Sequence, residues 1–103
     1  MHNDLYGTKS ADIDRIRLKV EGALDCKLTP HDSTYVGDYF RADLMNGEKI
    51  ILQRNIDPLD GKPSETKFSR YRCLIYISNT ARSSDIKQAL RRSGAGLTLL
   101  RHK

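Results

Sequence analysis

The run Tyr71–Ile77, written YRCLIYI, is the feature that most constrains what this chain can fold into. Isoleucine, tyrosine and leucine fill most of its positions, and β-branched and aromatic residues are enriched in strands. The polar residues Ser78-Asn79-Thr80 follow at once and are predicted to end the strand. Because a strand is stable only when other strands pair with it, the rest of the sequence has to supply a sheet.

A hairpin is predicted upstream, around the dipeptide Asn46-Gly47. Residues 34–44 alternate largely between apolar and polar side chains, as a strand with one buried face does. Residues 49–54 contain the triplet Ile-Ile-Leu, which predicts a return strand buried on more than one side. Asn-Gly is the strongest short hairpin signal, because both central residues of a type I′ turn need positive φ.

Two helices and a last strand complete the predicted elements. Apolar residues spaced three and four apart predict an amphipathic helix over about 11–24, with Ser10 as its N-cap. A shorter helix is predicted over 84–92, capped by Ser83 and stopped by the glycines that follow it. Residues 97–101 are then typical of a short strand.

These elements follow the order α-β-β-β-α-β and predict an α+β fold. Two helices would pack on one face of a four-stranded, mostly antiparallel sheet, as a two-layer sandwich. The C-terminal strand–helix–strand unit is predicted to form a parallel crossover of right hand. At this length we expect a single domain, 1–103. Residues 1–9 are expected to form a flexible tail, and the polar stretch 27–33, which contains a proline, to form a turn.

Charge is distributed unevenly along the sequence. Residues 1–61 hold 8 Lys and Arg against 11 Asp and Glu, a net of −3, whereas residues 62–103 hold 10 against 2, a net of +8. Such a chain either presents two electrostatic faces or folds so that its two halves interleave. The basic half is a common footprint of nucleic-acid binding, but the acidic half would repel the same phosphates.

The sequence contains no pattern typical of catalysis, cofactor binding or metal binding. It has no GxSxG, HExxH, phosphate-loop or dinucleotide-binding motif. His31-Asp32-Ser33 combines three catalytic residue types, but adjacent residues rarely point at one substrate atom, so we interpret it as a turn. Cys26 and Cys73 are expected to be reduced and largely buried. We therefore predict a protein that is not an enzyme and uses no cofactor or metal.

The sequence also gives an expectation about location. No apolar run approaches the roughly 20 residues that a helix needs to span a bilayer. The first residues lack the basic and apolar regions of a secretory signal. We expect a cytoplasmic protein with no membrane contact.

The stretch QRNIDPLDGKPSE, residues 53–65, is longer than a connection between two strands requires. Such loops are uncommon unless they are functional or disordered. Its two prolines restrict the chain, which lowers the entropy lost when a loop docks onto a partner. Its carboxylates, Asp57, Asp60 and Glu65, would complement a basic groove. A binding loop and a mobile connector both remain open.

Five stretches, spread over about residues 11–102, carry a pattern that is shared with one class of bacterial protein. They are Tyr35–Ala42, Glu48–Asn55, Asp57–Glu65, Cys73–Ile77 and Leu99–Arg101. In this pattern the chain resembles small immunity proteins, which are encoded beside polymorphic or contact-dependent growth-inhibition toxins. The resemblance implies a non-catalytic protein that binds one cognate toxin domain, often a nuclease, and blocks its active site.

The resemblance also implies which charges would touch the partner. Immunity proteins against nucleases are frequently acidic, because they occupy a phosphate-binding cleft, whereas this chain is basic in total. Either its acidic first half supplies the contact, or its basic half meets an acidic partner surface. The predicted partner-binding residues are Asp32, Asp38, Asp43, Asp57, Asp60 and Glu65. The alternative is a small RNA- or DNA-binding domain that uses the basic C-terminal half, with tyrosines on an open sheet face.

Overall fold

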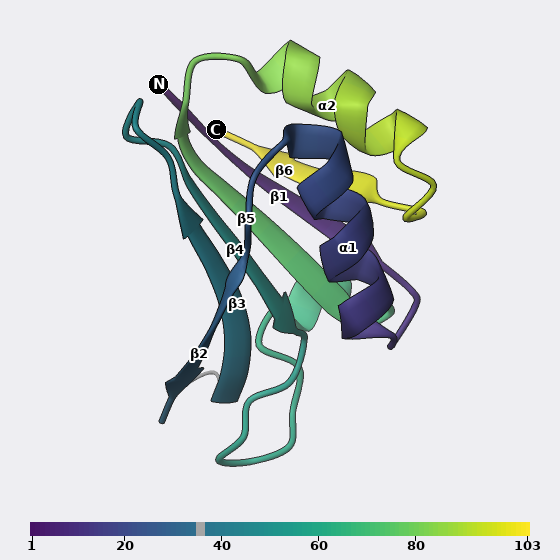
Figure 1. The fold of residues 1–103 in the computed structure, drawn as a ribbon. Helices are drawn as coiled ribbons and strands as arrows, with labels where there is room; N and C mark the ends of the chain where they lie inside the picture. The colour runs from purple at the N-terminus through teal and green to yellow at the C-terminus, as the bar shows by residue number, and fades with distance from the viewer. Residues whose placement is uncertain (35–36) are drawn as a thin grey trace.

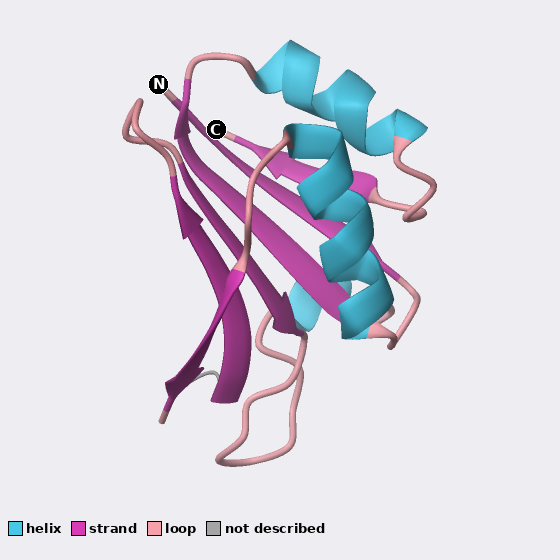
Figure 2. Cartoon of the chain, in the orientation of Figure 1, coloured by secondary structure: helices cyan, strands magenta, loops and turns pink. Residues whose placement is uncertain are grey.

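A computed structural model describes residues 1–34 and 37–103, whose strands form one six-stranded sheet with two helices on one face (Figures 1 and 2). The elements are β1 His2–Thr8, α1 Ile13–Leu24, β2 Thr29–Ser33, β3 Gly37–Asp43, β4 Lys49–Arg54, the 3-10 turn η1 Thr66–Phe68, β5 Cys73–Thr80, α2 Ser83–Arg92 and β6 Thr98–His102. The strands lie in the order β2-β3-β4-β5-β1-β6, and each neighbouring pair is antiparallel. The predicted α+β class is confirmed, whereas the predicted number of four strands is wrong.

The strand β1 stands where the sequence predicted a flexible tail over residues 1–9. It lies between β5 and β6, and its residues 4–8 are all buried. The prediction was wrong because only Leu5 and Tyr6 are strongly apolar here, so the sequence shows no strand pattern. A strand that is paired on both sides is also held by backbone hydrogen bonds, which the side-chain pattern does not reveal. Because β5 and β6 both pair antiparallel with β1, they run in the same direction without pairing with each other. The predicted crossover between two parallel-running strands is therefore confirmed, with α2 as its helix, although β1 lies between the two strands.

The strand β2 stands at an edge of the sheet, where the sequence predicted a turn over 27–33. It pairs with β3 from Thr29 opposite Arg41 to Ser33 opposite Gly37. Proline cannot donate a backbone hydrogen bond, but an edge strand leaves one side of its backbone unpaired and tolerates a proline there. Four of the five β2 residues are exposed, so no apolar alternation marks the strand in the sequence.

The hairpin between β3 and β4 is confirmed, and β4 occupies the predicted residues 49–54. Its turn differs from the predicted type I′, because Gly47 has a positive φ of 87° and the asparagine before it does not. The Gly47 N–H donates to the Leu44 carbonyl at 3.0 Å, which closes a three-residue loop with glycine in the left-handed position. The strand β3 begins at Gly37, and the predicted strand residues 35 and 36 lie outside the described residues.

Both helices begin near the predicted residues but have other caps. In α1, Asp12 is the N-cap and its carboxylate accepts the Arg15 N–H at 3.2 Å, while the predicted cap, Ser10, accepts the Asp12 N–H. In α2, the predicted cap Ser83 is the first helical residue, and Arg82 occupies the N-cap position. Neither of these helices, which belong to the described ranges, is long and apolar enough to cross a membrane.

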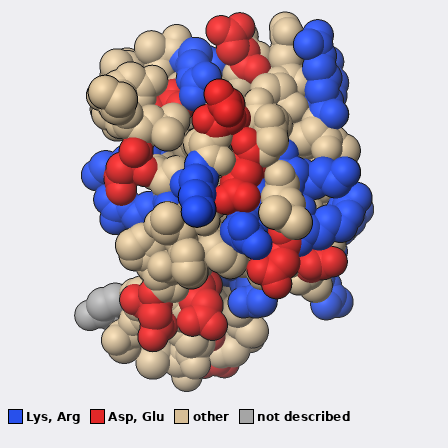
Figure 3. Space-filling view, in the orientation of Figure 1, with Lys and Arg blue, Asp and Glu red and all other residues tan. Residues whose placement is uncertain are grey.

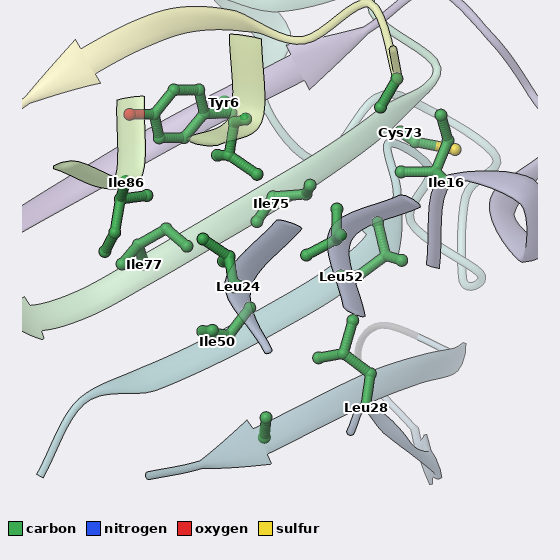
Figure 4. Packing of buried hydrophobic residues seen from close by; sticks show 14 of the residues in the cluster. Tyr6, Ile16, Leu24, Leu28, Ile50, Leu52, Cys73, Ile75, Ile77 and Ile86 are labelled. Carbon is green, nitrogen blue, oxygen red and sulfur yellow. The ribbon is translucent and has the colours of Figure 1, made fainter. Parts of the chain in front are cut away.

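The main core lies between the two helices and the sheet (Figure 4). The strand β5, predicted over 71–77, runs on to Thr80 and contributes to the centre of this core. Burial of these apolar side chains is the main favourable term that holds the layers together. The most deeply buried members are Ile16, Val20, Ile50, Leu52, Cys73, Ile75, Ile77, Ile86 and Leu90.

The acidic and basic halves of the sequence interleave in the fold. The strand β1, from the acidic half, lies between β5 and β6, from the basic half. An ion pair of 2.7 Å joins Glu48 of the first half to Arg82 of the second. Figure 3 shows side chains of both signs mixed over the helix-bearing face, with Lys and Arg more frequent toward the right-hand edge. The two halves therefore do not form two separate electrostatic faces.

Candidate protein-binding loop

The segment between β4 and β5, residues 55–72, folds back onto the sheet. At its base the Asn55 N–H donates to the Arg72 carbonyl at 2.8 Å. Its short turn η1 lies on the side of the sheet opposite α1 and α2 (Figure 2). The segment is thus closed at its base and laid against the helix-free face.

Asn55 holds this base together from a buried position. Its side-chain Nδ2 donates to the carbonyls of Phe68 and Tyr71 at 3.0 and 2.9 Å, and its Oδ1 accepts the Glu65 N–H at 2.9 Å. One amide side chain therefore satisfies three backbone groups of the segment. The sequence pattern does not predict this role of Asn55, and the available signal is an asparagine placed directly after an apolar strand.

Glu65 joins the segment to two strands of the sheet. Its Oε1 accepts hydrogen bonds from the Tyr76 hydroxyl of β5 at 3.0 Å and from the Arg101 guanidinium of β6 at 3.1 Å. Burial, together with the hydrogen bond to Glu65, raises the pKa of Tyr76. The predicted partner-binding carboxylate of Glu65 is thus already bonded within the chain, where it fixes the segment.

Two leucines on the helix-free face are buried outside the main core. Leu5 is 1% exposed and Leu74 is 0% exposed, and residues 64–71 lie on this side of the sheet. Packing here is close, because a Cβ on Gly7 would lie 2.7 Å from Leu100 Cδ1 and 2.9 Å from Tyr71 Cγ. The sheet face that the nucleic-acid alternative requires to be open is therefore covered over β5, β1 and β6.

The tip of the segment, residues 56–63, is ordered by its own hydrogen bonds. Asp57 accepts the Leu59 N–H through its Oδ1 at 2.8 Å, and its own N–H donates to the Lys62 carbonyl at 2.7 Å. Asp60 Oδ1 accepts the Lys62 N–H at 2.9 Å. Bonds from Asp side chains to nearby backbone groups fix turns. The two predicted carboxylates therefore shape the tip on which they stand.

Two large apolar side chains project from this tip. Ile56 is 45% exposed and Leu59 is 70% exposed. Apolar side chains that stand out from an ordered loop, beside charged residues, are typical of protein contacts. Pro58 of the tip lies 3.9 Å from the position that a Cβ on Gly37 would take, so the tip stands beside the start of β3.

Four of the six predicted carboxylates gather at this end of the molecule. Asp32 on β2 and Asp38 on β3 are exposed cross-strand neighbours on the helix-bearing face, and they lie at the end of the sheet from which the tip with Asp57 and Asp60 projects (Figure 1). In Figure 1 the tip and the β2–β3 strand ends both lie at the bottom, where Figure 3 shows acidic side chains. We name this surface the acidic end, formed by Asp32, Asp38, Ile56, Asp57, Leu59 and Asp60.

The other two predicted carboxylates lie elsewhere. Glu65 is turned onto the sheet by the bonds described above. Asp43 stands at the far end of β3, where Arg41 donates to its two oxygens at 2.8 and 3.0 Å. The hydrogen bond from Arg41 lowers the pKa of Asp43. The structure therefore does not bring these two residues to the acidic end.

The positions of the His, Cys, Asp and Glu side chains bear on metal binding and on thiol chemistry. Among residues 1–34 and 37–103, no three His, Cys, Asp or Glu side chains are placed to hold a metal ion. The thiols of Cys26 and Cys73 are not joined in a disulfide, and burial raises the pKa of both. Cys73 is buried as predicted, and Cys26 is partly buried.

Comparison with known proteins does not assign a family. The sequence matches no model of a known protein family, and no curated protein matches it. The function therefore rests on the geometry of the acidic end and on the pattern of the sequence.

Proposed function

We propose that this chain is an immunity protein, which binds a cognate bacterial toxin domain through the acidic end and blocks the toxin's active site. The observation that carries the proposal is the acidic end itself, where four carboxylates stand at the same end of the molecule as two exposed apolar side chains on a preordered tip (Figure 1). The resemblance in sequence pattern supports the same conclusion. Such a protein would act in the cytoplasm, where it meets the incoming toxin.

The charge of the acidic end favours a nuclease as the toxin. A nuclease cleft binds phosphates and is therefore lined by Lys and Arg. Asp32 and Asp38 repel each other in the free protein, because like charges directly opposite on two strands are destabilising. A cationic cleft would relieve this repulsion. The total charge of +5 does not oppose such a contact, since charges beyond the Debye length of about 8 Å are largely screened.

Ile56 and Leu59 would supply most of the affinity. Interface energy is concentrated in a few desolvated anchors, whereas charged groups chiefly set orientation and association rate. The turns made by Asp57 and Asp60 hold the tip in shape before binding, and Asn55 closes the base. A preordered tip loses little conformational entropy when it docks.

Nucleic-acid binding by the basic C-terminal half is the alternative function. Lys87, Arg91 and Arg92 are exposed on α2, away from the acidic end (Figure 1). However, Arg82 and Arg101 are paired with carboxylates of the same chain, and part of the sheet face is covered. These observations favour a protein partner over a nucleic acid.

The proposal predicts a toxin gene beside the gene for this chain, and the toxin domain that it encodes is the partner for the test. The two proteins should form a defined complex with an interface near ~1,600 Å², and the chain should inhibit the toxin's activity. The double variant Ile56→Ser/Leu59→Ser should weaken the Kd at least about tenfold, because two anchors are lost. Calorimetry with a catalytically inactive toxin domain would measure this change.

A matched control is available on other surfaces of the molecule. Leu18 is 61% exposed and Met45 is 107% exposed, so Leu18→Ser/Met45→Ser removes similar apolar area outside the acidic end. We expect this control to bind like the unaltered chain. Equal binding by both double variants, no complex at all, or nucleic acid that stays bound at physiological salt would each contradict the proposal.

A further inference from the structure

A separate cavity of about 180 Å³ lies where the start of α2 meets β1 and β6. It belongs to the opposite part of the fold from the acidic end. Most of its lining side chains carry hydrogen-bond donors. They are Asp4, Tyr6, Ser83, Ser84, Lys87, Leu99 and His102.

Two hydroxyl groups at this cavity are buried without a partner. Tyr6 is 2% exposed, and neither its hydroxyl nor Ser83 Oγ has a hydrogen-bond partner within the described residues. Figure 4 shows the Tyr6 hydroxyl at the edge of the core cluster, on the far side of the ring from Ile75. Burial, with a smaller effect of the Asp4 carboxylate, raises the pKa of Tyr6 to about 12. The phenol is thus a hydrogen-bond donor at neutral pH, and a buried donor without an acceptor is costly.

The first turn of α2 adds further donors to the same place. Its N-cap residue is Arg82, and no side chain of the described residues caps this helix end. The first N–H groups of a helix have no partner within the helix, and they carry the positive end of its dipole. Ser83 and Ser84 of this turn line the cavity, and Lys87 lies one turn further on. Such a helix start with a nearby lysine favours an anion.

Asp4 is the one acidic side chain that lines this cavity among the described residues. Its side chain is 1% exposed, and its Oδ1 is bonded to His102 Nδ1. The ring of His2 lies beside that of His102, with the centroids 4.7 Å apart and the ring planes tilted by 33°. The Asp4 carboxylate is therefore already engaged by an imidazole within the chain.

We propose that this cavity binds a phosphate-type oxyanion, which the α2 N-terminus, the Lys87 ammonium and the Tyr6 hydroxyl hold together. The anion accepts hydrogen bonds from donors that have no partner within the part of the chain that the structure describes. This site is independent of the acidic end and of the proposed toxin contact.

The test uses inorganic phosphate and the full chain. At constant ionic strength, phosphate should shift the backbone amide resonances of Ser84 and Asp85 in a saturable manner. Lys87→Gln should weaken the phosphate affinity about tenfold, because one charge-assisted hydrogen bond is lost. Arg91→Gln is the matched control on the same helix, because Arg91 does not line the cavity, and it should leave the affinity unchanged.

The variant Tyr6→Phe distinguishes an effect on phosphate binding from an effect on the stability of the fold. The variant should unfold at an equal or slightly higher temperature in phosphate-free buffer, because it removes an unpaired buried hydroxyl. It should also lose most of the rise in Tm that phosphate gives the unaltered chain. The proposal is overturned by any of three results: no saturable shift, an equal response to acetate or chloride, or phosphate affinities that neither Tyr6→Phe nor Lys87→Gln lowers.

Discussion

At the scale of single residues, the pair formed by Asp32 and Asp38 links stability to the proposed binding. The two exposed carboxylates stand directly opposite each other on β2 and β3. Like charges in this arrangement destabilise a strand pair. A cationic partner would remove the repulsion. The two carboxylates should therefore lower the stability of the free protein and raise the stability of the complex.

We therefore predict opposite effects of Asp32→Asn on stability and on binding. Removing one charge should raise the free energy of unfolding by less than about 1 kcal/mol, while the complex with the toxin domain weakens. Chemical denaturation and calorimetry would measure the two quantities. Asp43→Asn is the control, because Asp43 is paired with Arg41 away from the acidic end and should not affect binding. A fall in stability for Asp32→Asn would show that the carboxylates do not repel.

At the scale of elements, one buried carboxylate ties α2 to the β3–β4 hairpin. The Glu48 side chain is 1% exposed, and it accepts Arg82 at 2.7 and 3.2 Å and the Thr80 hydroxyl at 2.7 Å. The hydrogen bond from Arg82 holds the pKa of Glu48 below its ordinary value of 4.5, against the effect of burial. Glu48 therefore stabilises the fold while it is ionised and paired.

Arg82→Ala should destabilise the protein in a pH-dependent way. At neutral pH we expect a loss of about 3 kcal/mol, because the variant leaves a buried carboxylate without its cation. A lowered folded-state pKa gives stability that is complete above the unfolded value near 4.5 and is lost as pH falls through the folded value. The difference between the variant and the unaltered chain should therefore shrink in acid. Denaturation at several pH values, with Arg91→Ala as control, would measure this, and a pH-independent difference would contradict it.

A second prediction at this scale compares a crowded glycine in β1 with a glycine in α1 that has open space around it. Gly7 of β1 has Leu100 and Tyr71 within 3 Å of a Cβ, whereas a Cβ on Gly22 of α1 would meet nothing within 4 Å. Gly7→Ala should lower the free energy of unfolding by about 1–3 kcal/mol through overpacking. Gly22→Ala should raise it by up to about 1 kcal/mol, because alanine is the better helix former. A Gly7→Ala variant of unchanged stability would mean that β1 is not closely packed between β5 and β6.

At the scale of the whole molecule, the positions of the charged side chains on the surface depend on the fold and not on their order in the sequence. The halves interleave in the sheet, yet four carboxylates meet at the acidic end while Lys87, Arg91 and Arg92 stand on α2. Long-range attraction between such an end and a cationic cleft raises the rate of association.

We accordingly predict that salt slows formation of the toxin complex. Raising the ionic strength from low to above physiological values should reduce the association rate constant about tenfold or more, with a smaller change in the dissociation rate. Stopped-flow mixing would measure both. The Asp32→Asn/Asp57→Asn double variant should show a weaker salt dependence. An association rate that is independent of salt would remove the electrostatic part of the proposal.

The sequence predicted the elements whose side-chain pattern is strong. Both helices, β4 and the Asn-Gly hairpin follow from local periodicity and turn chemistry. The pattern did not reveal β1 and β2, because one is held by backbone pairing on both edges and the other is an exposed edge. At the candidate site, Asp57 and Asp60 stand on the predicted loop, whereas Asn55 was missed because its role lies in three backbone groups distant in sequence.

The sequence by itself determined the α+β class, the apolar strands of the core and a long loop rich in carboxylates. Only the tertiary structure decided that the first residues form an interior strand, paired on both sides, and that Glu65 faces inward. It likewise decided that Asp32 and Asp38 stand at the same end of the molecule as the loop tip (Figure 1). The physical reason is that a periodic pattern records which side chains are buried, whereas strand order and the meeting of distant charges depend on backbone pairing between segments far apart in the chain.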